Sequence, residues 1–232
     1  MKLFSLVIPI YNEAKNIDKL FLDIKNNIDI NRNEIVIIDD GSTDETQKVL
    51  TKYNSIKNLK IIKNTKNLGQ SFSVREGVIN SNHNIIVTMD GDGQNHPKDI
   101  SKLINLYLIN ESIYLVGGIR KKRRDSLIKI LSSKIANNIR MFLLNDKCSD
   151  TGCSLKVFDK NIFLKFPYFD GMHRFLPALY AGFGYKTIFT DVSHFKRQYG
   201  SSKYGTFDRL FKGVRDIFIV KKILKRKHLY DN

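Results

Sequence analysis

The sequence predicts an α/β domain in which helices flank a mostly parallel β-sheet. Short apolar runs rich in β-branched residues recur through the first half of the 232-residue chain, and segments with helical spacing separate them. Polar turns follow three of these runs directly. Strands that alternate with helices form right-handed βαβ units, and such units build parallel sheets.

The predicted elements alternate in order along the chain. Apolar runs predict strands at Leu3–Ile10, Glu34–Ile38, Leu59–Ile62, Ile85–Met89 and Ile113–Val116. A first helix is expected where apolar residues recur at helical spacing from Ile17 to Ile28, with Asn12 as its N-cap. Two further helices carry apolar residues at Val49, Leu50 and Tyr53, and at Val74 and Val78. The ends of the first, second and fourth strands should gather at one sheet edge, where open α/β sheets bind ligands.

The turn after the fourth strand carries two carboxylates, Asp90 and Asp92, on either side of Gly91. Mg²⁺ and Mn²⁺ prefer oxygen ligands and take one or two carboxylates, while substrate phosphates and water complete the shell. The pair therefore indicates a metal–diphosphate site. The alternative is a polar turn whose aspartates only cap the segment from Pro97 onward.

Two other strand ends would face this turn. Pro9, Tyr11 and Glu13 lie at the end of the first strand, and Asp39 and Asp40 end the second. Three polar turns that converge on one crevice favour a nucleotide site. The chain has neither a G-x-G-x-x-G segment after the first strand nor a G-x-x-x-x-G-K-[ST] segment, which disfavours a dinucleotide site and excludes a P-loop enzyme.

The formal net charge of +16 indicates an anionic partner: phosphates, an acidic membrane surface or nucleic acid. Basic residues cluster at 120–124 and 221–227, whereas the first hundred residues are mixed. The two cysteines, Cys148 and Cys153, are too few for a disulfide framework and are expected as reduced thiols in the cytoplasm. We expect no secretory signal, and no apolar run approaches the roughly 18 residues that span a bilayer.

Five motifs follow one another in order: V-I-P-I-Y-N-E, I-I-D-D-G-S-T-D, K-N-L-G-Q, M-D-G-D-G-Q and H-F-K-R-Q-Y-G-S-S-K-Y-G. Together they resemble the family 2 inverting glycosyltransferases of the GT-A fold, which has a Rossmann-like sheet. The nearest likeness is to the polyprenyl-phosphate sugar transferases, the dolichyl-phosphate mannose synthase and undecaprenyl-phosphate glucosyltransferase branch. The resemblance runs from Leu6 to Gly205 and implies a GT-A domain over residues 1–205, with a basic amphipathic helix and tail over 206–232.

The resemblance implies specific donor contacts. Nucleotide-binding positions fall on Pro9, Tyr11, Glu13, Ile38, Asp40, Asp90, Gly91, Asp92 and Lys203. Within this set Asp40 would accept a hydrogen bond from the base and Tyr11 would contact its ring, while Asp39 orders the turn. A cofactor Mg²⁺ or Mn²⁺ would be held by Asp90, Asp92 and Gln94. Gly93 replaces the family's leucine and should loosen the turn, and His96 is expected at the surface and not as a ligand.

The late motif and the segment after the fifth strand imply the remaining site residues. Arg197 and Lys203 would contact the diphosphate, with Lys203 as the leading candidate. The acceptor phosphate would meet Arg120, Lys129 and Ser133, although lysine stands at 129 where the family has arginine and Arg123 or Arg124 would have to compensate. The implied catalytic residues are thus Asp90, Asp92 and Arg120. His173, in a segment that flanks the acceptor side, could equally be a capping or packed residue.

Two apolar stripes indicate how the protein meets a membrane. They comprise Leu127, Leu131, Ile135, Ile139 and Phe142, and then Phe207, Leu210, Phe211, Val214, Ile217 and Phe218. Basic residues surround the second stripe at 209, 212, 215, 221 and 222, as in an interfacial helix on anionic headgroups. The alternative for both stripes is a helix packed on the sheet. We expect a cytoplasmic protein, peripheral on the inner face of the membrane and held by these helices or by a separate membrane subunit.

The sequence therefore predicts transfer of a sugar from a nucleotide-sugar donor, GDP-mannose or a UDP-hexose, to a polyprenyl phosphate. One alternative is a transferase of the same fold that acts on a glycan hydroxyl, which needs a general-base carboxylate such as Asp150 or Asp170. Another is a non-catalytic basic module bound to nucleic acid. Aromatic and basic residues interleave poorly and the five motifs would be unexplained, so we expect no nucleic-acid partner.

Overall fold

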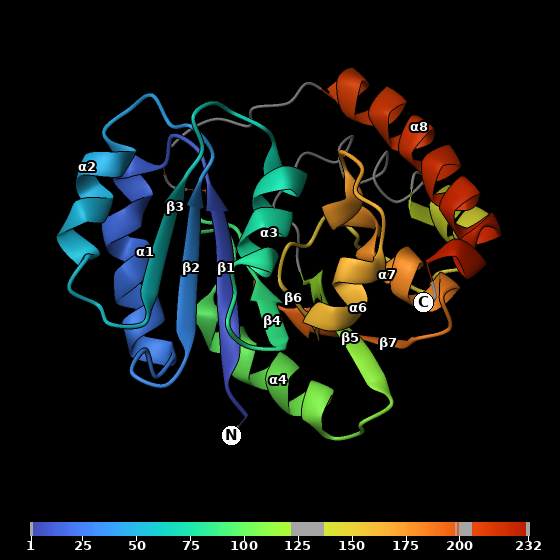
Figure 1. Cartoon of the computed structure of the whole chain (residues 1–232), viewed down its shortest axis with the longest axis horizontal. Coiled ribbons are helices and arrows are strands. Elements are labelled where there is room, and N and C mark those ends of the chain that lie inside the picture. Colours follow the sequence, from blue (N-terminus) through green and yellow to red (C-terminus); the bar gives the residue numbers. More distant parts are fainter. Residues whose placement is uncertain (1, 122–136, 198, 200–205, 231–232) are drawn as a thin grey trace.

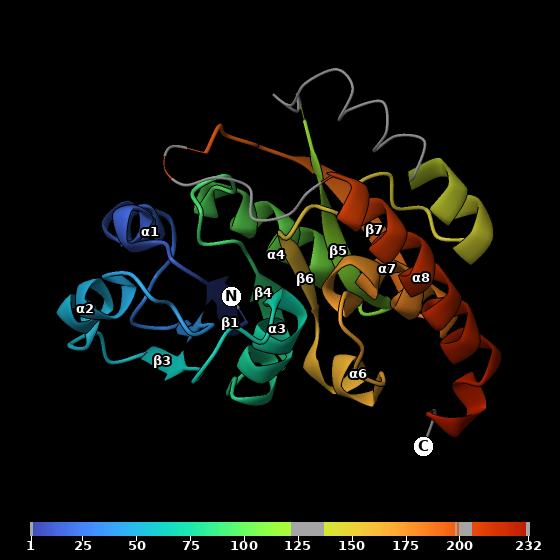
Figure 2. The same ribbon diagram turned by 90° about the horizontal axis from the view of Figure 1, so that it is seen from above.

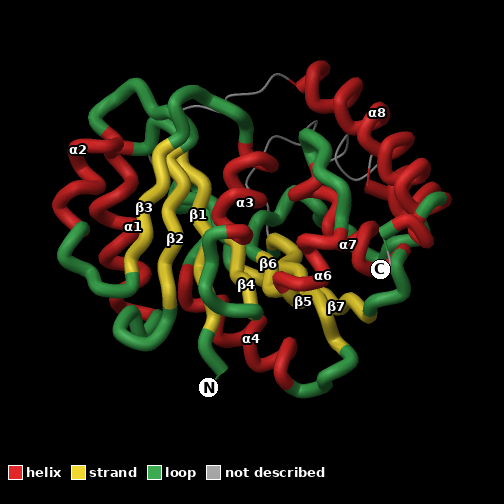
Figure 3. The backbone as a smooth tube through the Cα atoms, in the orientation of Figure 1, coloured by secondary structure: helices red, strands yellow, loops and turns green. Residues whose placement is uncertain are grey.

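The computed structural model describes residues 2–121, 137–197, 199 and 206–230, with only the backbone for 206–211 and 228. These residues form a seven-stranded sheet in the order β3-β2-β1-β4-β6-β5-β7, with helices on both faces (Figures 1 and 3). The strands are β1 (Phe4–Ile10), β2 (Glu34–Asp39), β3 (Leu59–Lys63), β4 (Ile85–Thr88), β5 (Ile113–Arg120), β6 (Lys156–Asp159) and β7 (Lys186–Val192). The predicted α/β class is confirmed.

The helices connect and cover these strands. They are α1 (Ala14–Asn27), α2 (Thr46–Leu50), α3 (Gln70–Ile79), α4 (Ile100–Leu108), α6 (Lys160–Lys165), α7 (Met172–Gly182) and α8 (Thr206–Lys225). Short 3₁₀ turns lie at η1 (Thr51–Tyr53), η2 (Pro97–Asp99) and η3 (Lys227–Leu229), and residues 137–144 are also helical.

The first four strands form the parallel part of the sheet. Strand β1 pairs in parallel with β2 on one side and β4 on the other, and β2 pairs in parallel with β3. Ile10 lies beside Asp39 in the register, so the turns after β1 and β2 begin at the same level. The predicted gathering of the first, second and fourth strand ends is confirmed.

The second part of the sheet is mixed and includes two strands that the sequence analysis did not predict. Strand β6 runs antiparallel between β4 and β5, where Lys156 lies across from Thr88 on one side and Gly117 on the other. Strand β7 pairs in parallel with β5, which continues to Arg120, four residues beyond its predicted end. Arg120 therefore lies on a strand end and not in a loop.

Two hydrophobic clusters fill the two faces of the sheet. On one face, α1, α2 and α4 pack against alternate residues of β1 such as Leu6 and Ile8. On the other face, α3, α6 and α7 cover Val7 and its neighbours, and α8 lies outside against α7 (Figure 2). Because both faces are covered, the polar sheet edge that carries the strand-end turns is where a ligand can approach.

Helix α1 begins at Ala14, and Asn12 is not its N-cap, contrary to the prediction. Asn12 has a φ angle of 55°, and its side-chain oxygen accepts the Thr43 N–H at 2.8 Å. The first N–H groups of the helix are met from the second turn instead. Glu13 donates to Thr46 Oγ1 at 3.0 Å and Ala14 to Asp44 at 3.3 Å. A side chain from the neighbouring turn thus replaces the local cap.

The predicted apolar stripe of α8 divides into two faces. Ile217 is buried with Val220 and Ile223 in the cluster that contains α7, whereas Val214 and Phe218 are 49% and 67% exposed. Part of the helix thus packs on the domain and shares its core, and part faces outward. The stripe residues at 207, 210 and 211, with those at 127, 131 and 135, lie outside the described side chains. Among described helices, none is long and apolar enough to cross a bilayer.

Candidate functional site

The turns after β1 and β2 are bonded to each other and form one surface. Asn12 N–H donates to Ser42 Oγ at 2.8 Å, and Asp40 N–H donates to the Ile10 carbonyl at 2.9 Å. Tyr11, half-buried, lies in the first of these turns. Two of the five sequence motifs therefore act as a single structural unit, as the predicted nucleotide crevice requires.

The two aspartates that end β2 hold different turns. Asp39 is fully buried and accepts the Ser42 N–H at 2.9 Å, which confirms its predicted role in ordering its own turn. Asp40 accepts the N–H groups of Leu68 and Gly69 at 2.9 and 2.8 Å, and the Asn64 side chain at 3.0 Å. Asp40 thus anchors the K-N-L-G-Q motif, a role that the sequence analysis missed. Its contact with a base stays a prediction.

Ile38 needs a correction. Its side chain is fully buried in the cluster with Val7 and Val74, because residue alternation along β2 turns it toward α3. Only the backbone of Ile38 remains for the predicted nucleotide contact. Pro9, by contrast, is half-buried and lines a small cavity with Asp90 at the strand tips.

Asp90 follows β4 and lies in a polar setting made by distant residues. Its Oδ1 accepts the Gln70 side chain at 2.7 Å, and its backbone N–H donates to Ser154 Oγ at 3.2 Å. Burial and the neighbouring charge of Asp92 raise the pKa of Asp90 to about 6. Two carboxylates on one turn, one of them hard to ionise, form a place where added positive charge is stabilising.

Asp92 contacts the late motif. The Arg197 guanidinium lies 3.1 Å from Asp92 and 2.9 Å from Glu13, and both carboxylates are nearly buried. Phe195 N–H donates to the Gln94 carbonyl at 2.9 Å, so the segment around 195 lies directly on the D-G-D-G-Q turn. Residues more than 100 positions apart in the chain meet here, and the contact of Arg197 with a diphosphate stays a prediction. Lys203 lies outside the described residues.

The D-G-D-G-Q turn is less loose than predicted. Gly93 has a φ angle of 76°, which leucine adopts only with strain, and Gln94 N–H closes the turn on Asp92 Oδ1 at 3.0 Å. Gly91, buried between the two aspartates, stays a predicted nucleotide contact. His96 is partly buried and not a plain surface residue, since its Nδ1 accepts the Lys98 N–H at 3.1 Å.

Arg120 lies at the end of β5 and is held by Asp150. Its Nε and Nη2 donate to the two carboxylate oxygens at 2.7 and 2.6 Å. Burial acts to lower the pKa of Arg120, but the hydrogen bonds and charge of Asp150 raise it above the ordinary value. The positive charges of Lys156 and Arg120 oppose the rise in the pKa of Asp90. Because Asp150 binds Arg120 and Ser154 binds the Asp90 N–H, the two predicted parts of the site lie near each other. Lys129 and Ser133 fall outside the described residues.

Other predicted polar residues have structural partners. His173 Nδ1 lies 2.6 Å from Ser71 Oγ, and burial, with the charge of Arg174 next, lowers the pKa of His173 well below its ordinary value. His173 is therefore a neutral, packed side chain. Asp170 is exposed and pairs with Lys212 at 2.5 Å. Neither Asp150 nor Asp170 stands ready to take a proton from a hydroxyl.

The carboxylates at the strand tips do not make a closed metal cage. In the part of the chain that the structure describes, no group of three or more His, Cys, Asp or Glu side chains could hold a metal ion. A pair of aspartates with one amide side chain leaves half of the positions of an octahedral shell open. Such an arrangement suits an ion that a diphosphate and water complete.

Comparison with known proteins identifies relatives of the whole chain. The family model described as "Glycosyl transferase family 2" matches residues 5–166. Dodecaprenyl-phosphate galacturonate synthase from Rhizobium johnstonii is 34% identical over 230 residues, which cover 96% of this chain and 68% of that protein. Undecaprenyl-phosphate 4-deoxy-4-formamido-L-arabinose transferase from Pectobacterium carotovorum is 31% identical over 211 residues, 88% of this chain and 63% of that protein. The chain thus spans about two thirds of the length of these relatives.

Solved structures share the fold. Glucosyl-3-phosphoglycerate synthase from Mycobacterium tuberculosis, in complex with Mn²⁺, UDP and phosphoglyceric acid, aligns with a TM-score of 0.68 over 96% of this chain and 78% of that chain, at 16% identity. The same enzyme with Mg²⁺ and UDP gives a TM-score of 0.69 over 96% and 79%, at 16% identity. With a family match over most of its length, a mixed sheet of the GT-A type and the acidic tip met by Arg197, the chain belongs to glycosyl transferase family 2.

Proposed function

We propose that this chain is an inverting glycosyltransferase that moves a sugar from a nucleotide-sugar donor to a polyprenyl phosphate. The two relatives described above are named for dodecaprenyl phosphate and undecaprenyl phosphate. The observation that carries the proposal is the meeting of one acidic strand tip with two arginines from distant segments. Arg197 contacts Asp92, and Arg120 pairs with Asp150, four residues before the Ser154 hydroxyl that accepts the Asp90 N–H. Two anions, a diphosphate and an acceptor phosphate, would each have a cation of their own.

The residues present fit a hard divalent cation. Asp90, Asp92 and Gln94 would hold Mg²⁺ or Mn²⁺ through oxygen atoms, and a bound cation would offset the burial and the Asp92 charge that raise the pKa of Asp90. The bound ion would act as a Lewis acid on the departing nucleoside diphosphate. Arg197 now neutralises Asp92 and Glu13, and it would turn to the diphosphate once Asp92 serves as a ligand. Lys203 would add a second cation there.

The nucleoside would lie over the bonded turns of β1 and β2. The residues proposed to line it are Pro9, Tyr11, Glu13, Asp40 and Gly91, with the backbone of Ile38. These turns are rigid because hydrogen bonds join them to each other and to the K-N-L-G-Q motif. A preformed surface of this kind positions the donor without further ordering cost.

The acceptor needs a cation more than a base. A phosphate monoester oxygen is already anionic near neutral pH, so no carboxylate has to deprotonate it. Arg120, with Lys129 and Ser133, would hold that phosphate in line behind the anomeric carbon. A glycan hydroxyl would require a general base, and both candidate carboxylates, Asp150 and Asp170, are engaged with cations. The lipid phosphate is therefore the favoured acceptor.

We further propose that the protein works at the cytoplasmic membrane face as a peripheral protein. Phe142 is 87% exposed and Ile139 52% on the helical segment 137–144, and Val214 and Phe218 project from α8. Exposed cations, including Arg215 and Lys222, accompany the outward face of α8. Apolar side chains amid cations suit an anionic lipid surface. Sedimentation with vesicles of anionic phospholipid tests this, and failure to bind would favour a separate membrane subunit.

A transfer assay tests the proposed function. The purified chain would be incubated with radiolabelled UDP- or GDP-sugars, Mn²⁺ and a polyprenyl phosphate, after a thermal-shift screen has chosen the nucleotide. We expect label in the organic-extractable lipid, dependence on added Mg²⁺ or Mn²⁺, and loss of label when a chelator is present. Label in a water-soluble glycan, or no transfer with any donor, would overturn the proposal.

A further inference from the structure

The loop 150–156, D-T-G-C-S-L-K, lies between the acceptor arginine and the metal-site aspartate. At one end, both oxygens of Asp150 accept hydrogen bonds from the Arg120 side chain, and the Arg120 backbone N–H donates to Asp150 at 3.1 Å. Near the other end, Ser154 Oγ accepts the Asp90 N–H at 3.2 Å and bonds Asn95 at 2.6 Å. A single short loop thus contacts both parts of the proposed site.

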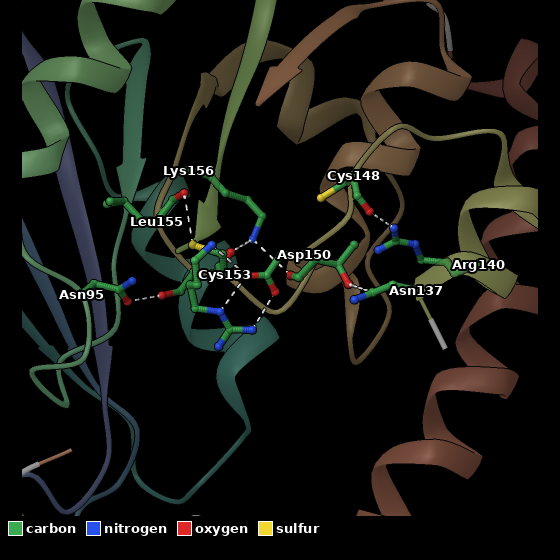
Figure 4. A network of polar contacts seen from close by, with 11 residues as sticks. Asn95, Asn137, Arg140, Cys148, Asp150, Cys153, Leu155 and Lys156 are labelled. Atoms are coloured by element: carbon green, nitrogen blue, oxygen red, sulfur yellow. Dashed lines mark hydrogen bonds and ion pairs between the residues drawn. The ribbon is translucent and has the colours of Figure 1, made fainter. Parts of the chain in front are cut away.

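The loop is itself fixed by buried polar contacts. Lys156, 3% exposed, donates its Nζ to the carbonyls of Cys153 and Thr151, and Cys153 N–H donates to the Asp150 carbonyl at 3.2 Å. Thr151 Oγ1 bonds the Asn137 side chain at 3.3 Å (Figure 4). The Asp150 carboxylate therefore stands on a backbone that cannot shift easily, and it can impose its orientation on the arginine.

The pairing leaves donors of Arg120 for another anion. A guanidinium has five N–H groups in a planar fork, and Asp150 accepts two of them. Gly152 permits this close approach, because a Cβ there would lie 2.9 Å from Arg120 Nη2. Of the remaining three N–H groups, one on each terminal nitrogen lies along the Nη1–Nη2 edge, in the geometry that suits bidentate binding of a phosphate.

We infer that Asp150 is the positioning residue of the acceptor site: it holds the Arg120 guanidinium in one orientation, so that its open edge receives the acceptor phosphate. This inference rests on the proposed function. It assigns Asp150 a role opposite to that of a general base, because the carboxylate acts through Arg120 and takes no proton. Lys156 stabilises the loop that carries Asp150, because its Nζ donates to the carbonyls of Thr151 and Cys153.

The test substitutes Asp150→Asn and compares it with Asp146→Asn. Asp146 forms a second buried pair, with Arg140 at 3.1 Å, four residues earlier in the chain, so it controls for the loss of a buried Arg–Asp pair as such. Losing a charge-assisted pair should raise the KM for the polyprenyl phosphate about 10- to 100-fold in Asp150→Asn. The KM for acceptor in Asp146→Asn should stay within about twofold of wild type, which is the usual scatter of near-neutral changes.

Binding of a short, water-soluble prenyl phosphate, measured by calorimetry, gives a readout independent of turnover. We expect Asp150→Asn to weaken this binding as much as it raises the acceptor KM, while the melting-temperature shift from the donor nucleotide is unchanged. Gly152→Ala keeps both charges and crowds Arg120 Nη2, so it should weaken the same binding if Asp150→Asn does not fold.

A double-mutant cycle decides whether Asp150 acts through Arg120. In an Arg120→Lys background, Asp150→Asn should add less than about a twofold change to the acceptor KM, because the fork that it orients is already gone. Additive effects, or a fall in kcat at saturating acceptor with KM unchanged, would overturn the inference and point to proton transfer. If the wild-type chain transfers sugar to lipid and the cycle is additive, the inference alone fails. If the wild type makes no lipid-linked product, the proposed function fails with it.

Discussion

The two halves of the sheet stabilise buried carboxylates in different ways. In the N-terminal half, from β1 to β4, the aspartates accept backbone N–H groups of nearby turns, as Asp39 does from Ser42 and Asp40 from Leu68 and Gly69. In the C-terminal half, from β5 to α8, buried aspartates also pair with arginines. The pairs are Arg120–Asp150, Arg140–Asp146 and Arg174–Asp216.

The difference has an energetic consequence. When a carboxylate that holds backbone N–H groups is lost, neutral donors are left without a partner. When the partner of a buried arginine is lost, an uncompensated charge remains in a poorly hydrated place, which costs more. Removal of a single charge should therefore lower the stability more in the C-terminal half. The N-terminal half should have the more rigid turns.

The largest effect is expected where the two halves meet, at the contact between Asp92 and Arg197. Asp92→Ala removes a predicted metal ligand, so turnover should fall on the order of 10³-fold. The fold should persist, because Arg197 keeps Glu13 as a partner at 2.9 Å. Transfer rate and far-ultraviolet circular dichroism measure the two quantities. Activity close to wild type in this variant would reject the metal assignment.

A pair of isosteric substitutions tests the contrast in stability. Asp216 is fully buried, so Asp216→Asn removes the carboxylate that Arg174 pairs with in a place without water. The free energy of unfolding should fall by about 3 kcal/mol. Asp40→Asn keeps one acceptor oxygen and loses one, so about 1 kcal/mol is expected. Urea titration of both variants compares these values.

The matched control for this contrast is the double variant Arg174→Gln with Asp216→Asn. It removes the stranded charge, so it should be more stable than Asp216→Asn alone. Equal losses at positions 40 and 216, or a double variant less stable than the single one, would show that the arginine pairs are no more demanding than the turn contacts.

Proton binding should also separate two carboxylates within the N-terminal half, Asp90 and Asp44. The pKa of Asp90 is raised to about 6 from 3.8 by burial and the charge of Asp92. Between these values the folded protein binds more protons there than the unfolded chain, so the stability of the metal-free protein falls as pH rises. The loss should reach about 3 kcal/mol at neutral pH. Thermal unfolding in chelator follows this, with Asp90→Asn as the variant that should lose the dependence.

Asp44 in the N-terminal half should show the opposite sign. Burial acts to raise its pKa, but hydrogen bonds from Thr46 and Ala14 lower it below the ordinary value of 3.8. Its contribution to stability is present above that value and is lost as pH falls below it. If wild type and Asp90→Asn show the same slope above pH 4, the Asp90 assignment is wrong.

The smallest effect on stability is expected at the outward face of α8, which neither kind of pair touches. Val214→Ser with Phe218→Ser changes exposed side chains, so the free energy of unfolding should move by no more than about 0.5 kcal/mol. Partition onto anionic vesicles should fall about tenfold, because the apolar area that enters the lipid is lost. Unchanged vesicle binding would remove α8 from the membrane-binding surface.

The contrast between the halves explains how much of the fold could be predicted. Strands β1 to β4 are rich in apolar residues, and the predicted bounds agree with the structure to within one residue at each end. Strand β6 has four residues that begin with a lysine, and β7 is largely half-exposed and lacks an apolar run. Neither carries the pattern of a buried strand, so the inserted antiparallel strand could be found only in three dimensions.

The site divides in the same way. The acidic tip and the turn aspartates were predictable because a motif places each polar residue directly after a strand. The Asn12 cap was wrong because Thr46 and Asp44, more than 30 residues away, supply the acceptors that a local cap would give. The pairing of Asp150 with Arg120 spans 30 residues and has no local spacing signal, and the sequence suggested a general base instead.

The inverted direction of β6 decides which of its ends reaches the crevice. Because Lys156, its first residue, lies across from Thr88, the last residue of β4, the chain arrives in the sheet beside Asp90. If β6 ran in the other direction, the segment with Asp150, which pairs with Arg120, would lie at the opposite edge of the sheet. The chain therefore leaves the sheet at this edge after β1, β2 and β4, enters it at β6, and leaves it again after β5 at Arg120. Longer loops after β1 and β2 should therefore leave the position of Arg120 unchanged.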